Sequence, residues 1–238
     1  MSGHSHAKTI MHKKGAADAK RSQVFSKLAK ELTLVAKEGG GDPTANPRLR
    51  TIIDKAKASN MPSDNIDRAI KKATGEDAKL IQEILLEAYG PGNIALLISA
   101  ITDNRNRTIG EIKQILQKYQ GKMVEGGAMR WLFEHKGVVT VEPKESTPSS
   151  REELEFLAIE AGAEDLHWQG DMLDIYTDPS NLASLKQKLA EKEVRTRSSL
   201  DWVPKDRTRM NQSHHEAAER LFEALQEQDD VQDIYSNL

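Results

Sequence analysis

The chain has 238 residues, and 37% of them are hydrophobic, which suffices for one large domain or two to three small domains with ordinary packed cores. Its longest clean apolar run, Ile94 to Ile101, has the length of a strand, so we expect no membrane span, and the polar residues after Met1 indicate no secretory signal. Cysteine is absent, which excludes disulfides, thiolate catalysis and cysteine zinc sites and fits a reducing, cytoplasmic location.

The net charge of -3 hides an uneven distribution of charged residues. Residues 1–75 carry a net charge of +8, and the remaining residues carry -11. A polyanion is therefore expected to be attracted to the N-terminal third of the chain. The alternative is that the cations only keep a helical domain soluble.

The N-terminal third has the apolar spacing of helices. In residues 18–37 the apolar positions follow a helical period, while Lys20, Lys27, Lys30 and Lys37 fall on the other side, which faces solvent or phosphate. Glycines 39–41 end this helix, because glycine accepts the left-handed geometry of a C-terminal cap.

Two shorter helices are expected to follow. Asn46 is a good N-terminal cap, and Pro47 suits the first helical position, where no backbone donor is needed. Arg48 and Lys55 flank the apolar stripe of this helix on one side, and Arg50 and Lys57 flank it on the other. After Pro62 a third helix runs to about residue 74. A small three-helix domain is predicted.

Beyond residue 78 the pattern changes to strands separated by helices. Ranges 81–89 and 93–102 flank the turn Gly90-Pro91-Gly92 and predict a hairpin, followed by a helix over 106–119 and a strand over 129–135. From residue 137 the order of elements is that of a ferredoxin-like unit, with the ranges 138–142, 152–161, 165–168, 172–177, 179–192 and 194–203.

The last helix and strand, 213–228 and 231–235, could complete the sheet that begins at Ile81. The chain is therefore expected to be an α+β protein, with an N-terminal three-helix domain and two small α/β domains, the last of them ferredoxin-like and inserted into the second. The expected domains are 1–77, then 78–136 together with 205–238, and the insertion 137–204.

A candidate anion site lies at residues 102–108, where a strand ends and a helix begins. Arg105 and Arg107 bring positive charge, and the free amides of the helix start add a partial positive charge, so the site suits a phosphate or a carboxylate. In the alternative interpretation, Asn106 or Thr108 merely caps the helix and the arginines pair with acidic neighbours.

The first residues form a basic arm that could become ordered on nucleic acid. Its side chains that could donate hydrogen bonds to phosphates are His4, Lys8, His12, Lys13 and Lys14. Histidines 4, 6 and 12 could also hold a metal, but no cysteine or nearby carboxylate completes a tight site. The chain has no nucleophile elbow, no dinucleotide-binding glycine motif and no zinc-protease spacing. We therefore expect neither catalysis nor a cofactor.

Several of these segments together resemble the YebC family. The resemblance is carried by His4-Ser5, 12–15 (HKKG), 18–21 (DAKR), 38–43 (EGGGDP), 46–50 (NPRLR), 54–57 (DKAK), 60–62 (NMP), 64–66 (DNI), 68–72 (RAIKK), 89–92 (YGPG), 102–108, Phe133 and Lys136-Gly137. It covers the whole length, densely to about residue 137. One departure is that members commonly have Lys-Trp-Ala after the His-Ser pair, where this chain has His6-Ala7-Lys8 and so lacks an aromatic that could stack on a base.

The resemblance implies a helical N-terminal domain, two α/β domains and regulation rather than catalysis. Family members are labelled probable transcriptional regulators, whereas others, including a mitochondrial relative, look like ribosome-associated translation factors. We expect a nucleic-acid partner, DNA or ribosomal RNA, and no membrane partner. A third possibility is a protein–protein adaptor whose acidic domains bind a basic partner. The predicted contact residues are His4, Lys8, His12, Lys13, Lys14, Lys20, Arg21, Lys27, Arg48, Arg50, Lys55, Lys57, Arg68, Lys71, Lys72, Arg105 and Arg107.

Overall fold

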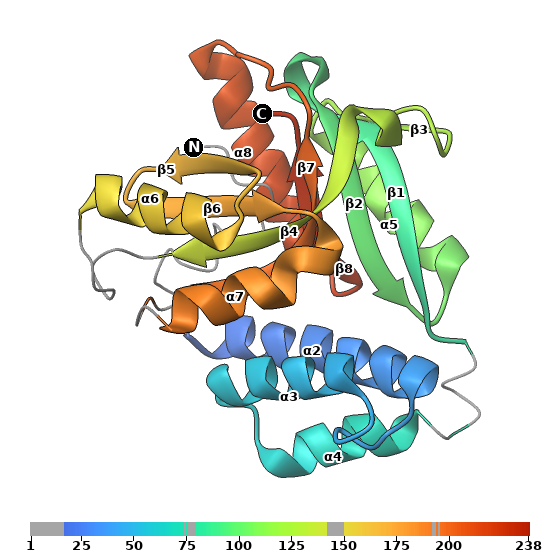
Figure 1. Cartoon of the computed structure of the whole chain (residues 1–238). Helices are drawn as coiled ribbons and strands as arrows, with labels where there is room; N and C mark the ends of the chain where they lie inside the picture. Colours follow the sequence, from blue (N-terminus) through green and yellow to red (C-terminus); the bar gives the residue numbers. More distant parts are fainter. Residues whose placement is uncertain (1–16, 74, 76–79, 142–149, 192–193, 195) are drawn as a thin grey trace. The chain divides into compact units, whose positions relative to one another are not determined.

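The computed structural model describes residues 17–73, 75, 80–141, 150–191, 194 and 196–238 (Figure 1). The described chain divides into two compact units. We call the part within 7–129 and 209–234 the helix–sheet unit, and the part within 130–208 and 235–238 the ferredoxin-like unit. None of the helices in these described ranges combines the length and apolarity that crossing a bilayer requires.

Three helices open the helix–sheet unit, as predicted from the apolar spacing. They are α2 (Ala17–Gly39), α3 (Pro47–Ala58) and α4 (Ser63–Lys72). Leucines 28 and 32 of α2 pack with Leu49 of α3 and Ile66 of α4 in one buried cluster. This cluster is the hydrophobic stripe that each amphipathic helix turns towards its neighbours.

Asn46 is confirmed as the cap of α3, and its side chain also binds the end of α2. The Asn46 side-chain oxygen accepts a hydrogen bond from the Leu49 amide at 3.0 Å, and Pro47 occupies the first helical position. The buried Asn46 amide also donates to the carbonyls of Val35, at 3.1 Å, and Gly40, at 2.9 Å. One side chain therefore fixes both the start of α3 and the end of α2.

The first sheet has the strand order β3-β1-β2-β8. Strands β1 (Gln82–Tyr89) and β2 (Ala95–Thr102) form the predicted antiparallel hairpin around the one-turn helix η2 (Pro91–Asn93). All eight residues of β2 are buried, as its continuous apolar sequence indicates. Helix α5 (Arg105–Lys118) follows β2, and the three-residue strand β3 (Lys122–Val124), which the sequence did not predict, pairs with β1.

The end of the chain returns to this first sheet. Helix α8 (Gln212–Gln226) precedes β8 (Val231–Ser236), which lies next to β2. The two last elements thus complete the sheet begun by β1, as the sequence suggested. The domain boundaries at 77/78, 136/137 and 204/205 stay predictions.

The segment between β3 and α8 forms a second, antiparallel sheet with the strand order β5-β6-β4-β7, which is the ferredoxin-like order. Its elements are β4 (Phe133–Val141), α6 (Arg151–Ala161), β5 (Asp165–Gln169), β6 (Met172–Thr177), α7 (Leu182–Glu191) and β7 (Thr196–Pro204). Leu154 of α6, Leu185 of α7 and Val139 of β4 belong to one buried cluster.

Strand β4 differs from the sequence prediction. The ranges 129–135 and 138–142 were expected to be separate strands, but one strand runs from Phe133 to Val141 through Gly137. A side chain at Gly137 would meet the Leu182 Cβ at 3.0 Å and the Thr177 Cγ2 at 3.1 Å. The glycine is there because α7 approaches the strand closely, and it does not end the strand.

We predict that Asn46→Ala destabilises the protein more than Asn211→Ala, which removes the exposed cap of α8. The Asn211 change should cost about 1 kcal/mol in the free energy of unfolding, as caps do. The Asn46 change should cost about 2 to 3 kcal/mol, because two further hydrogen bonds are lost in a buried place. Urea unfolding measures both values, and equal losses would show that the extra bonds contribute nothing.

Candidate nucleic-acid interface

Part of the predicted interface lies outside the described residues. This applies to His4, Lys8, His12, Lys13 and Lys14, and for Lys20 only the helical backbone is described. The basic arm therefore stays a prediction. No cluster of three metal-binding side chains occurs within the described ranges.

The lysines of α2 contact other parts of the helix–sheet unit in addition to solvent. The ammonium groups of Lys27, Lys30 and Lys37 donate to the carbonyls of Gln226 (2.7 Å), Asp229 (3.0 Å) and Ile81 (2.9 Å), respectively. Gln226 ends α8, where helix carbonyls lack partners within the helix. The expectation that this face is open to phosphate therefore does not fit Lys27, Lys30 or Lys37.

Burial changes the acidity of Lys27. It lowers the pKa of the ammonium group to about 8, although the charges of Asp233 and Asp229 act in the opposite direction. The ammonium group is therefore still mainly charged at neutral pH, but it loses its proton more easily than an exposed lysine as the pH rises.

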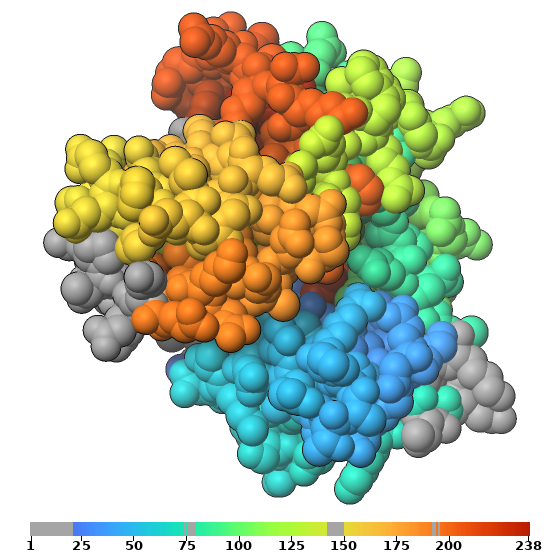
Figure 2. Space-filling view, viewed as in Figure 1, coloured from blue at the N-terminus to red at the C-terminus, as the bar shows by residue number. Residues whose placement is uncertain are grey.

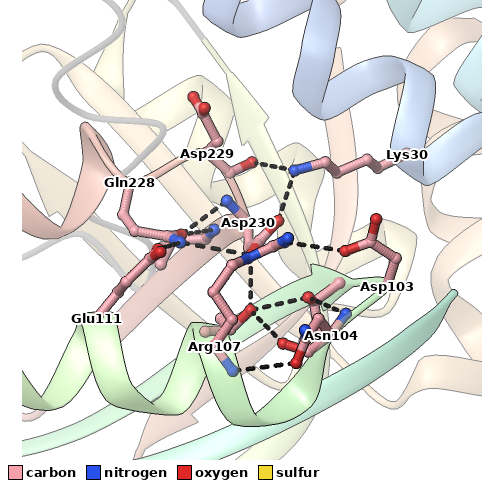
Figure 3. A network of polar contacts seen from close by, with 11 residues as sticks. Lys30, Asp103, Asn104, Arg107, Glu111, Gln228, Asp229 and Asp230 are labelled. Carbon is pink, nitrogen blue, oxygen red and sulfur yellow. Dashed lines mark hydrogen bonds and ion pairs between the residues drawn. The ribbon is translucent and has the colours of Figure 1, made fainter. Parts of the chain in front are cut away.

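A buried carboxylate, Asp230, connects α2 to the start of α5 (Figure 3). The Asp230 side chain is 2% exposed, and the Lys30 ammonium lies 2.5 Å from its Oδ1. Its Oδ2 accepts from the Thr108 hydroxyl at 2.6 Å and from the Arg107 guanidinium at 3.2 Å. We call these four residues the Asp230 cluster. The anion site predicted at residues 102–108 is therefore occupied by a carboxylate of the chain itself.

Other side chains shape the start of α5. The cap is Asn104, whose side-chain oxygen accepts from the Arg107 amide at 3.1 Å, and neither Asn106 nor Thr108 fills this position. Arg107 also pairs with Asp103 at 2.9 Å, as the alternative interpretation expected. Arg105 is exposed and makes no polar contact within the described part of the chain.

The Asp230 carboxylate stays ionised over the whole physiological range. Burial acts to raise its pKa, but the hydrogen bonds from Lys30 and Thr108 and the nearby positive charges outweigh burial and lower the pKa to about 2. The ionic contact between α2 and α5 is thus permanent above about pH 4.

Three cations of α3 are exposed but engaged at the surface. Arg48 pairs with Glu38 at 2.7 Å, and Lys55 pairs with Glu31 at 2.9 Å. Arg50 donates to the carbonyls of Pro43 and Thr44 at 3.0 to 3.1 Å. Exposed pairs of this kind are weak and exchange easily, so these cations can still contribute to a surface potential. In the space-filling view the atoms of this helical segment, blue to cyan, form a continuous exposed surface (Figure 2).

A groove of about 450 Å³ lies between α2, α4 and the end of β2, and we call it the α2–α4 groove. Arg68 and Lys72, one helical turn apart on α4, line it, and hydroxyls of α2 and the amide of Asn65 add polar groups. Arg68 and Lys72 are exposed and make no polar contact within the described ranges. Lys30 also lines the groove, and Asp103 is the acidic residue among its lining.

A second groove, of about 590 Å³, lies between α3 and α4. Arg50, Lys57 and Lys71 line it, but so do Asp54 and Asp67. Of the predicted cations, Arg21 is exposed on α2 and lines neither groove. The sequence did not indicate that Ser22, Ser26 and Asn65 would join Arg68 and Lys72, because these residues become neighbours only when α2 and α4 pack.

We predict that Asp230→Asn lowers stability by about 2 kcal/mol or more at neutral pH, because Lys30 and Arg107 lose their buried counter-charge. The pKa of Asp230 is lower in the folded than in the unfolded state, so its contribution is complete above about pH 4 and is lost as the pH falls to about 2. The variant should lack this component of acid destabilisation. Urea unfolding at several pH values tests this, with Asp229→Asn, an exposed neighbour, as the control.

The chain matches two family models along almost its entire length. Residues 5–76 match the TACO1/YebC N-terminal domain, and residues 81–238 match the TACO1/YebC second and third domains. A "probable transcriptional regulatory protein" of Pseudothermotoga lettingae is 47% identical over 100% of this chain and 93% of that protein. One of Trichlorobacter lovleyi, with the same name, is 44% identical over 100% of this chain and 95% of that protein.

A solved structure agrees with the sequence matches. The crystal structure of a conserved hypothetical protein from Aquifex aeolicus superimposes with a TM-score of 0.86 at 40% identity, covering 96% of this chain and 94% of the other. The α+β fold predicted from the sequence is thereby confirmed. The resemblance noted from the short motifs holds over both family models, and this chain belongs to the TACO1/YebC family.

Proposed function

We propose that this protein is a non-enzymatic regulator of gene expression that binds the phosphates of a nucleic acid through its helical segment. The observation that carries the proposal is the α2–α4 groove, where Arg68 and Lys72 stand exposed beside hydroxyl and amide groups. Lysine, arginine, serine and asparagine are among the side chains that contact phosphates in protein–nucleic-acid complexes. The names of the relatives support a role in regulation.

The contact is proposed to position the nucleic acid and not to read its bases. The exposed residues at the start of α4 include Asp64 and Asp67, whereas the cations Arg68, Lys71 and Lys72 follow towards its end. A recognition helix reads bases with its N-terminal residues, and two carboxylates there would repel the phosphates beside the groove. Arg105 and the basic arm are proposed as further phosphate contacts.

DNA is the first proposed target, because the relatives are named probable transcriptional regulatory proteins. Ribosomal RNA is the alternative, and the charge distribution favours it. Residues 76–238 carry a net charge of -11, which would oppose a long duplex. On a ribosome, RNA phosphates lie next to basic proteins, so that both the basic and the acidic parts of the chain would find partners.

We predict that Arg68→Glu combined with Lys72→Glu weakens binding to nucleic acid at least about tenfold at moderate salt, because two phosphate contacts are lost. The dependence of log affinity on log salt should become shallower by about 1.8. The control is Lys113→Glu with Lys118→Glu, two exposed lysines of α5 that line neither groove and give the same change in net charge. Equal losses in both variants would contradict the groove as the site.

Sedimentation of lysate at low and high salt distinguishes the two targets. Comigration with ribosomal particles that is sensitive to salt and lost in the Arg68/Lys72 variant would favour the ribosomal alternative. Sedimentation away from ribosomes, with DNA fragments recovered after crosslinking, would favour transcription. Absence of the protein from both fractions at low salt would contradict the proposed function.

A further inference from the structure

Helix α6, labelled in Figure 1, is apolar on two opposite sides. Its buried side carries Leu154, Ala158 and Ala161, which pack in the core of the ferredoxin-like unit. On the other side Phe156 is 62% exposed and Ile159 is 61% exposed. These two residues are three positions apart and are therefore neighbours on the helix surface. A surface helix normally has one apolar side, so the fold alone does not account for the second one.

Helix α7 packs in the same core but has only one apolar side. Leu185 and Leu189 are its buried residues. Its exposed residues are small, polar or charged, namely Ala183, Ser184, Lys186, Gln187, Lys188, Ala190 and Glu191. Burying this core therefore does not require large apolar side chains on the outer side of a helix, and Phe156 and Ile159 are specific to α6.

Carboxylates surround the two exposed apolar residues of α6. Glu152, Glu153 and Glu160 are exposed on the same side of the helix, and none of their carboxylates makes a polar contact within the described chain. Glu152 and Glu153 stabilise the start of the helix, where its dipole is positive. Glu160 lies in the last turn, where a negative charge is unfavourable and no basic residue compensates it. We call Glu152, Glu153, Phe156, Ile159 and Glu160 the α6 face.

The charge of the α6 face decides which kind of partner fits it. Its carboxylates would repel the phosphates of a nucleic acid and the anionic headgroups of a bilayer. A second copy of the same face would bring the carboxylates of both copies together, which is also unfavourable. A basic protein surface instead gains opposite charges around an apolar contact, which is the usual arrangement of apolar centre and polar rim at an interface.

We propose that the α6 face binds a basic, amphipathic helix of another protein. Apolar residues three positions apart form a ridge that fits the groove of a second helix, so Phe156 and Ile159 pack against the apolar side of the partner. The three carboxylates pair with lysines or arginines that flank this side. The inference goes beyond the proposed function and does not depend on it, because α6 lies in the ferredoxin-like unit and the α2–α4 groove lies in the helix–sheet unit.

The first test measures binding of a dye-labelled synthetic helix to the full chain by fluorescence anisotropy. The probe peptide has about 15 residues, with leucines at helical spacing on one side and lysines on the other. A scrambled peptide of the same composition keeps the charge but lacks the apolar side, and it should bind at least about tenfold more weakly. Equal binding of the two peptides, or binding of neither, would overturn the inference.

The second test removes the apolar centre of the α6 face. Phe156→Gln combined with Ile159→Gln should weaken binding of the amphipathic peptide at least about tenfold. Thermal unfolding of this variant should show no loss of stability, because both side chains are exposed and glutamine favours a helix. Unchanged peptide binding would contradict the inference. A lower unfolding temperature would also contradict it, since Phe156 and Ile159 would then serve the packing of the protein itself.

The third test removes the carboxylates of the α6 face. Glu152→Gln, Glu153→Gln and Glu160→Gln together should weaken binding of the peptide about threefold to tenfold at low salt and make it less sensitive to salt. The matched control changes the net charge equally at exposed residues of α8 and its C-terminal cap, by Glu216→Gln, Glu223→Gln and Glu227→Gln. It should leave binding unchanged. Equal losses in both variants would reduce the effect to attraction by net charge and would argue against a site on α6.

Discussion

The buried carboxylate of Asp230 is the constraint on which the helix–sheet unit depends. It joins Lys30 of α2 to Arg107 and Thr108 of α5. Lys30 lies more than 75 positions before these two residues in the chain. A buried ion is stable only when it is paired and hydrogen-bonded, so removing any one partner leaves an uncompensated charge or donor. Lys30 of this contact also lines the α2–α4 groove, together with residues of α4 and the end of β2.

The Asp230 cluster explains why the cations of this chain fall into two classes. Lys27, Lys30, Lys37 and Arg107 bind carbonyls and carboxylates of their own unit, and the three lysines connect α2 to residues next to or within the first sheet and α8. Arg68 and Lys72 have no such partner within the described ranges and line the groove. A phosphate that bound Lys30 or Arg107 would have to displace Asp230, at the cost of leaving a buried carboxylate without its counter-charges, whereas Arg68 and Lys72 need no exchange of partners.

Elements with strong local signals could be predicted from the sequence. The Asn46-Pro47 start of α3, the Gly90-Pro91-Gly92 turn and the ferredoxin-like order of elements each depend on residues within one segment. The missing or wrong parts depend on distant residues. Gly137 was interpreted as a strand boundary, because the sequence does not show that Leu182 packs against it in the folded chain. The sequence at residues 102–108 predicted an anion site, but it did not show that the carboxylate of Asp230 occupies this site.

The uneven distribution of charge bears on the choice of target. Residues 1–75 carry a net charge of +8, whereas residues 76–238 carry -11. A long duplex held by the helical segment would be opposed by the acidic remainder of the chain. A target that offers phosphates beside basic proteins, as the ribosome does, would give both parts a partner, and this is the physical argument for ribosomal RNA over duplex DNA.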